Sequence, residues 1–92
     1  FEKLHVVFGT VSDKDPQKSI ALLPKKATYY LARPDIPRGM NALELQMAFD
    51  ANGLSSYAYD SVSEALQSAR RASSSKDLVL VCGSIFVVAE AL

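Results

Sequence analysis

The chain has 92 residues, of which 49% are hydrophobic and 22% are charged. This composition is typical of one globular domain and excludes an intrinsically disordered chain, which has too little apolar surface to form a core. Ten basic residues balance ten acidic ones, so no net charge attracts nucleic acid or an anionic membrane, and we expect neither as a partner.

Cys82 is the only cysteine, which excludes an internal disulfide. Its apolar neighbours predict a buried, reduced thiol without a catalytic role, in a cytoplasmic protein. No segment resembles a signal peptide, and every apolar run is far shorter than the roughly 20 residues of a membrane span. Because the sequence begins with Phe1 and ends within an apolar helical pattern, we expect a piece of a larger polypeptide.

Four segments have the composition of β-strands, and a helical pattern follows each of them: residues 4–8, 28–32, 56–59 and 77–82. This alternation predicts an α/β, Rossmann-like, mainly parallel sheet of about four strands with helices on both faces. The last strand, LVLVC, is apolar at every position, which predicts burial on both faces and a central place in the sheet. The third, SYAYD, is shorter and less apolar and fits an edge.

Capping residues mark the ends of the predicted helices. Asp15 followed by Pro16 marks the start of the first helix,. Asn41 and Ser61 each stand three residues before a glutamate, as in a capping box, and mark the next two,. Helical periodicity predicts two core-facing stripes: Leu43, Met47 and Ala51 on the second helix, and Val62, Ala65, Leu66 and Ala69 on the third,.

Candidate functional residues follow three of the predicted strands. Ligands of an open parallel sheet bind beyond the carboxyl ends of its strands, where loops and helix N-termini converge. Residues 9–15, 33–41 and 83–84 occupy these positions. We expect the three segments to gather on one edge of the sheet, whereas His5 begins the first strand at the other edge and is expected to be structural.

The first segment contains three consecutive charges. Lys14 has the chemistry to hold a phosphate or a carboxylate, and Asp13 or Asp15 to orient a metal-bound water or a ligand hydroxyl,. The alternative is that Asp15 is a helix cap and Lys14 a solvated neighbour. The cap is the better interpretation of Asp15, and for Asp13 and Lys14 both interpretations stay open.

The other two segments offer anion-binding groups. In RPDIPRG, prolines restrict the backbone around Arg38, whose planar guanidinium suits a carboxylate,. The alternative is an ordinary surface arginine. Gly83 permits close approach of backbone or ligand, and Ser84 is predicted to cap a helix, a role compatible with binding an anion,.

Several catalytic motifs are missing. The sequence contains no GxxxxGK[ST] or GxGxxG loop, no Cys/His metal spacing, and no serine–histidine–acid set with a histidine on this edge,. We therefore expect this chain alone to be inactive, with no catalytic residue and no metal ligand of its own.

Three phrases carry a family resemblance: HVVFGTVSDKD, ALLPKKATYYLARPDIPRGMNALEL and DLVLVCGSIFVVAEAL. They resemble the C-terminal domain of folylpolyglutamate synthase, the folate-pathway member of the Mur ligase superfamily that in bacteria often also acts as dihydrofolate synthase. The likeness covers nearly the whole chain, and we take residues 1–92 as one domain of this type. The family's Asp-Gly-Ala-His-Asn-type motif is absent, so the resemblance implies a domain lacking its first strand–helix unit and the central ATPase domain.

The resemblance also implies a reaction and a set of site residues. ATP, with Mg²⁺ held by the central domain, phosphorylates a folate or dihydropteroate carboxylate, and the amine of L-glutamate then displaces phosphate. Asp13, Lys14 and Asp15 would face the nucleotide, and Arg38 and Ser84 the glutamate. The alternative is a self-contained regulatory or interaction domain of the receiver or flavodoxin-like kind, which is weaker because a receiver needs a phosphorylatable aspartate after a central strand.

Overall fold

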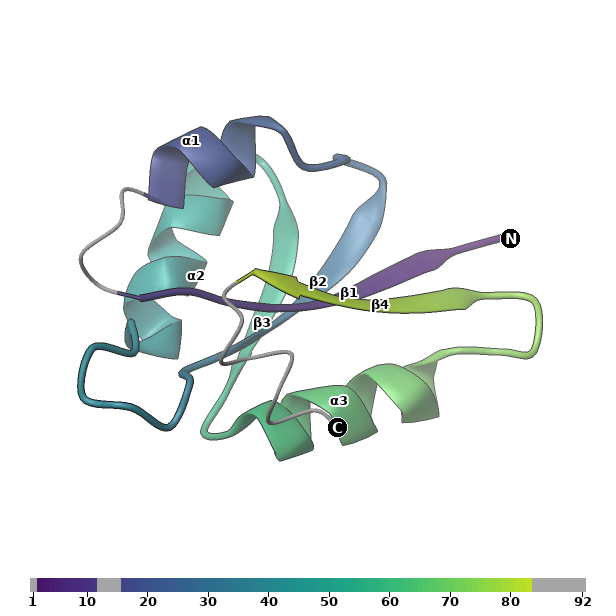
Figure 1. The fold of residues 1–92 in the computed structure, drawn as a ribbon. Helices are drawn as coiled ribbons and strands as arrows, with labels where there is room; N and C mark the ends of the chain where they lie inside the picture. Colours follow the sequence, from purple (N-terminus) through teal and green to yellow (C-terminus); the bar gives the residue numbers. More distant parts are fainter. Residues whose placement is uncertain (1, 12–15, 84–92) are drawn as a thin grey trace.

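A parallel four-stranded sheet forms the centre of the molecule, as a computed structural model describes it for residues 2–11 and 16–83. Strands and helices alternate along the chain (Figure 1). In order they are β1 (Leu4–Gly9), α1 (Pro16–Ala21), β2 (Ala27–Ala32), α2 (Ala42–Ala51), β3 (Ser55–Tyr59), α3 (Val62–Ala72) and β4 (Leu78–Gly83). The four predicted strands and the α/β class are confirmed.

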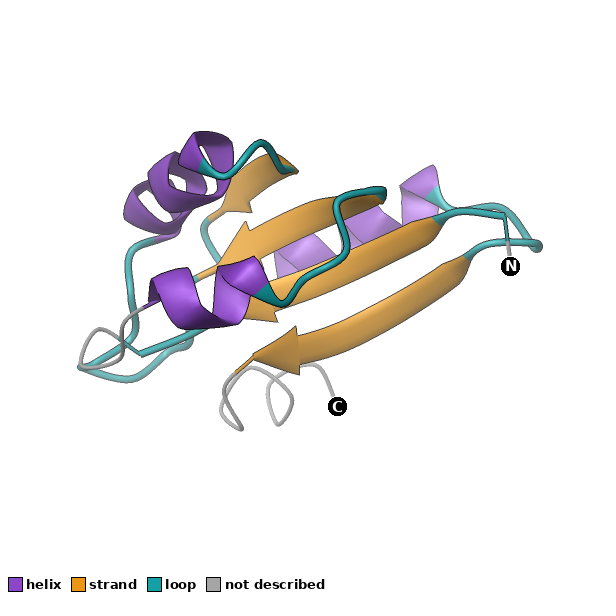
Figure 2. Cartoon of the chain, turned by 90° about the horizontal axis from the view of Figure 1, so that it is seen from above, coloured by secondary structure: helices purple, strands orange, loops and turns teal. Residues whose placement is uncertain are grey.

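The strands are ordered β3-β2-β1-β4, and every neighbouring pair is parallel. All four arrows therefore point the same way in Figure 2. The chain moves outward from β1 to β2 and β3, then returns across the sheet to place β4 on the free side of β1. The order thus reverses between β1 and β4, which is the topological switch point of the sheet.

Helices cover both faces of the sheet, as predicted (Figure 1). On one face, α1 and α2 close a core of nine buried residues: Val6, Phe8, Ile20, Ala27, Tyr29, Leu31, Leu45, Phe49 and Leu54. On the other face, α3 closes a smaller core: Val7, Tyr30, Ala32, Val62, Ala65 and Ala69. Strand residues alternate between the two cores because successive side chains point to opposite faces.

The predicted core face of α2 is wrong. Leu43 is 64% exposed and Met47 72% exposed, and Ala51 is exposed as well. The helix instead buries Leu45 and Phe49, whose ring lies 5.1 Å from that of Tyr29 and 5.5 Å from that of Phe8. Both stripes of α2 are apolar, so periodicity did not distinguish them; aromatic packing against the sheet did. On α3, the predicted face is confirmed.

The predicted central place of β4 is also wrong, because β4 pairs only with β1 among the described strands. Leu78 is 43% exposed and Leu80 46% exposed. The predicted burial of β4 on both faces is therefore wrong as well, so an all-apolar sequence did not establish either the burial or the central place of this strand. The central strands are β1 and β2, and β3 lies at an edge as predicted.

The predicted helix ends in the described residues are confirmed. The Asn41 Oδ1 accepts hydrogen bonds from the backbone amides of Leu43 and Glu44 at 2.8 and 3.4 Å. The Ser61 hydroxyl accepts one from the amide of Glu64 at 3.1 Å. These caps satisfy amides that have no partner within their helices, and so fix where the loops after β2 and β3 end.

Candidate functional site at the carboxyl edge of the sheet

The switch point brings the ends of β1 and β4 together. Gly9 and Gly83 face one another in the parallel register. The backbone approach is so close that a Cβ built on Gly83 would lie 2.1 Å from the carbonyl oxygen of Gly9. The chain therefore leaves both strands at the same point of the edge, where ligands of this sheet class bind.

The loop after β2 is joined to the chain leaving β1. The amide of Met40 donates to the carbonyl oxygen of Thr10 at 2.9 Å, and Val11 forms an isolated antiparallel bridge with Gly39. Thr10 and Val11 are both buried. The described parts of the three predicted segments thus gather on one edge, and backbone hydrogen bonds connect the first two.

The loop that bears Arg38 is held by its own backbone. The amide of Gly39 donates to the Ile36 carbonyl at 3.0 Å, and Arg33 Nε donates to the Gly39 carbonyl at 3.0 Å. Pro34 is fully buried beneath the loop. Arg38 is exposed, so the loop carries an arginine at the surface on a backbone that hydrogen bonds hold.

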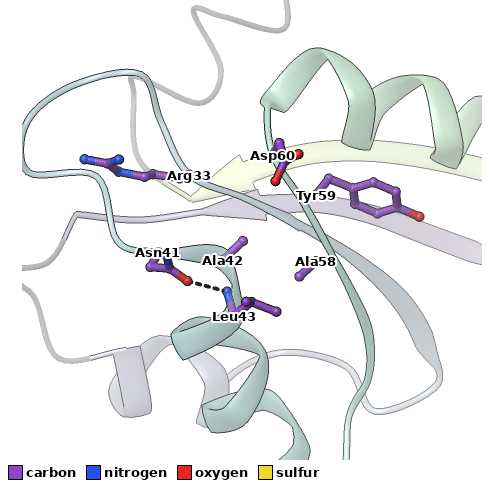
Figure 3. A pocket seen from close by; sticks show the side chains of 7 residues that line it. All are labelled: Arg33, Asn41, Ala42, Leu43, Ala58, Tyr59 and Asp60. Carbon is purple, nitrogen blue, oxygen red and sulfur yellow. Dashed lines mark hydrogen bonds between the residues drawn. The ribbon is translucent and has the colours of Figure 1, made fainter.

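A pocket of about 280 Å³ opens between the loops after β2 and β3. Figure 3 shows its seven lining residues: Arg33, Asn41, Ala42, Leu43, Ala58, Tyr59 and Asp60. A neighbouring hollow of about 340 Å³ shares Arg33 and Asp60. The Arg33 guanidinium points away from Asp60 (Figure 3), in agreement with its hydrogen bond to the loop carbonyl. The aliphatic part of the Arg33 side chain therefore lines the pocket, and its guanidinium is directed toward the Gly39 carbonyl.

Sequence reasoning missed the part that the loop after β3 plays at this edge. Asp60 follows β3 directly, so the rule that selected the other three segments applies to it equally. It was overlooked because no motif marks it. The predictions on Asp13, Lys14, Asp15 and Ser84 lie outside the described residues.

Two further titratable groups are the partly buried Cys82 and His5, which lies at the other edge. Burial raises the pKa of the Cys82 thiol, which disfavours the thiolate and agrees with a structural cysteine. His5 is buried near the amino edge and hydrogen-bonded to Tyr30 and Asp77, so its predicted position away from the carboxyl edge is confirmed. Within residues 2–11 and 16–83, no three His, Cys, Asp or Glu side chains cluster as metal ligands would.

No helix of the described chain has both the length and the apolarity needed to cross a membrane.

Comparison with known proteins decides the family. The model of the "Mur ligase, glutamate ligase domain" family matches residues 2–85. The chain belongs to this family. A probable bifunctional folylpolyglutamate synthase/dihydropteroate synthase of Haloferax volcanii is 37% identical over 92 residues, which are 99% of this chain and 11% of that protein. A dihydrofolate synthase/folylpolyglutamate synthase of Buchnera aphidicola is 28% identical over 96% of this chain and 21% of its own length.

Solved structures of this glutamate ligase family confirm the fold. E. coli FolC in complex with DHPP and ADP superposes with a TM-score of 0.86 and 31% identity, over 97% of this chain and 21% of FolC. The bifunctional folylpolyglutamate synthase/dihydrofolate synthase of Yersinia pestis, complexed with AMPPNP and Mn ion, gives a TM-score of 0.80 and 34% identity, over 95% of this chain and 20% of that one. The resemblance to the C-terminal domain of these synthases is confirmed. The chain spans between about a tenth and a fifth of the length of these relatives.

Proposed function

We propose that this glutamate ligase domain forms the glutamate side of the active-site cleft in an ATP-dependent folate ligase. The observation that carries the proposal is the convergence of the β1, β2 and β4 ends on one edge, in a chain of the glutamate ligase family. Folylpolyglutamate synthase is the activity named for the Haloferax, Buchnera and Yersinia proteins alike. Addition of L-glutamate to a folate or dihydropteroate carboxylate is therefore the reaction class we assign.

The domain's part in this reaction is to hold the incoming amino acid. We assign Arg38 and Ser84 to the glutamate side and Asp13, Lys14 and Asp15 to the nucleotide-facing side of the cleft. A guanidinium on a fixed loop can bind a carboxylate of glutamate through two parallel hydrogen bonds. This contact would orient the amine that attacks the acyl phosphate, and closure of the cleft would exclude water from that intermediate.

We assign ATP and the divalent metal chiefly to the rest of the polypeptide. Relatives carry ADP, or AMPPNP with Mn, but the described residues of this chain contain no cluster of three metal-ligating side chains. A central ATPase domain would supply the phosphate loop and the Mg²⁺ site. By this division of labour, the isolated 92-residue domain is inactive and its nucleotide contacts are secondary.

Arg38→Ala in the full-length ligase tests the assignment. Loss of a two-point, charge-assisted contact is expected to raise the KM for L-glutamate by about 10- to 100-fold, while the KM for ATP changes by less than about threefold, because ATP binds elsewhere. The measurement is initial-rate kinetics with each substrate varied in turn.

Arg70→Ala is the matched control for this experiment. Arg70 is also an exposed arginine, but it lies in the last turn of α3 at the amino edge of the sheet. The same substitution there is expected to leave both KM values unchanged. Glutamate kinetics that are the same in the Arg38 variant and in the wild type would refute the glutamate-side assignment.

A further inference from the structure

We propose that Gly39 and Gly83 are positioning residues for the glutamate side of the cleft, an inference that rests on the proposed function. Both lie at the carboxyl edge, and backbone atoms crowd both. A Cβ on Gly39 would lie 2.3 Å from the carbonyl oxygen of Pro34, and one on Gly83 would lie 2.1 Å from that of Gly9. Real Cβ contacts essentially never fall below 3.0 Å.

The obstruction at Gly83 cannot be relieved by rotating a side chain. Three backbone atoms of Gly9 lie within 3.2 Å of the virtual Cβ. The strand that carries Gly9 is paired on both sides, with β2 and with β4, and the next residue, Thr10, accepts the hydrogen bond from Met40. The edge strand β4 has only one described neighbour, so the end of β4 must yield.

The obstruction at Gly39 acts on the neighbouring loop. Gly39 bridges to Val11, and its carbonyl accepts the hydrogen bond from Arg33. Pro34, whose carbonyl blocks the Cβ, is itself fully buried. A methyl group at this position must therefore shift the loop that presents Arg38. Gly39 directly follows Arg38 in the sequence, so this shift would reach the residue that we assign to the carboxylate of glutamate.

A third glycine provides the contrast. Gly53 ends α2 at the amino edge of the sheet, and nothing lies within 4 Å of its virtual Cβ. Gly53 and Gly83 both have positive φ angles, +75° and +108°, so alanine strains the backbone at either position. Only at Gly83 does the added methyl also meet another strand. Alanine at Gly53 or at Gly83 should therefore lower stability, but only alanine at Gly83 should also shift the backbone at the carboxyl edge of the sheet.

The experiment measures steady-state kinetics of the full-length ligase carrying Gly83→Ala, Gly39→Ala or Gly53→Ala, well below each variant's Tm. We expect the two edge variants to raise the KM for L-glutamate by about 10- to 100-fold, as an ångström-scale misplacement does. The KM for ATP should change by less than about threefold. Gly53→Ala should lower Tm and leave both KM values unchanged, a separation that a merely structural role would not produce.

Each outcome of this experiment supports or refutes the positioning role of the two glycines. Wild-type glutamate KM values in folded edge variants overturn the positioning role, as does an equal rise in Gly53→Ala. If one edge variant does not fold, the other carries the test. If neither folds, the glycines serve stability alone and the proposal is wrong. A wild-type enzyme that forms no amide from ATP, folate and glutamate refutes the proposed function itself.

Discussion

The two edges of the sheet are built in different ways. At the amino edge, side chains form a buried chain of hydrogen bonds: His5 Nδ1 lies 2.9 Å from the Tyr30 hydroxyl, and His5 Nε2 lies 2.9 Å from Asp77 Oδ2. At the carboxyl edge, every described hydrogen bond has a backbone group as at least one partner, and the charged residues Arg38 and Asp60 are exposed.

The residues that stabilise the amino edge are thus different from those that we propose to bind a ligand at the carboxyl edge. The imidazole of His5 joins the starts of β1 and β4 through Asp77, and contacts β2 through Tyr30. With an ionised Asp77, Nε2–H donates to the carboxylate, and Nδ1 shares the second hydrogen bond with the Tyr30 hydroxyl,. Side-chain bonds thus join three strands at the amino edge, in addition to the backbone pairing of the strands.

The largest effect should follow from His5→Ala. This change removes both hydrogen bonds of the ring, leaves the buried Tyr30 hydroxyl without this partner, reduces the bonds to Asp77 to the one from the Ser74 amide, and opens a cavity. We expect a loss of about 2–4 kcal/mol in the free energy of unfolding, measured by urea titration of the 92-residue chain.

The same substitution tests the separation of the two edges. In the full-length ligase, His5→Ala should leave the KM for glutamate unchanged at temperatures where the domain is folded. A large rise in that KM would show that the amino edge also controls the substrate site.

A smaller, pH-dependent effect should follow from Asp77→Asn. The hydrogen bond from His5, and then that from the Ser74 backbone, hold the pKa of Asp77 below its usual 3.8. A lowered pKa means that this carboxylate stabilises the fold above about pH 4, and that the stabilisation is lost as pH falls through the lowered value. Urea midpoints of the wild type should therefore fall more steeply below pH 4 than those of the variant.

Asp50→Asn is the control for that experiment, since Asp50 is an exposed carboxyl on α2. Its acid profile should follow the wild type. If the Asp77 variant keeps the wild-type profile too, the carboxylate does not contribute to the network as described.

The smallest effect should follow from Tyr30→Phe, which deletes one hydroxyl and leaves the ring packed between α3 and the sheet. Loss of one buried hydrogen bond is expected to reduce the free energy of unfolding by about 1 kcal/mol. Tyr57→Phe, at a ring that is 56% exposed, should change it by less than about 0.5 kcal/mol. Equal effects at the two tyrosines would contradict a special role for the Tyr30–His5 bond.

Local signals predicted the elements of this fold well, because they depend on neighbours in the sequence. Asn41 and Ser61 were recognised as caps since a cap needs only its own side chain and the next amides,. The parallel sheet followed from the alternation of strands and helices. The gathering of three segments on one edge followed in turn, because carboxyl ends of parallel strands share an edge.

Long-range choices were not predictable in the same way. The helix α2 has two apolar stripes, and either could have faced the sheet. Leu45 and Phe49 are the pair that packs against it, and Leu43 and Met47 are exposed. The place of β4 depended on which strand it paired with. The buried contact of His5 with Asp77 joins residues 72 positions apart, and no local pattern announces such a pair.

The sequence by itself determined the strands, the caps and the parallel direction of the strands, because short-range hydrogen bonding and side-chain periodicity specify them. The family followed from the resemblance of three stretches of sequence. Only the tertiary structure decided the switch point between β1 and β4, the buried face of α2, and the backbone contacts at Gly39 and Gly83. These features arise when segments distant in the chain compete for the same space, and packing between them, not the preference of either segment, selects the outcome.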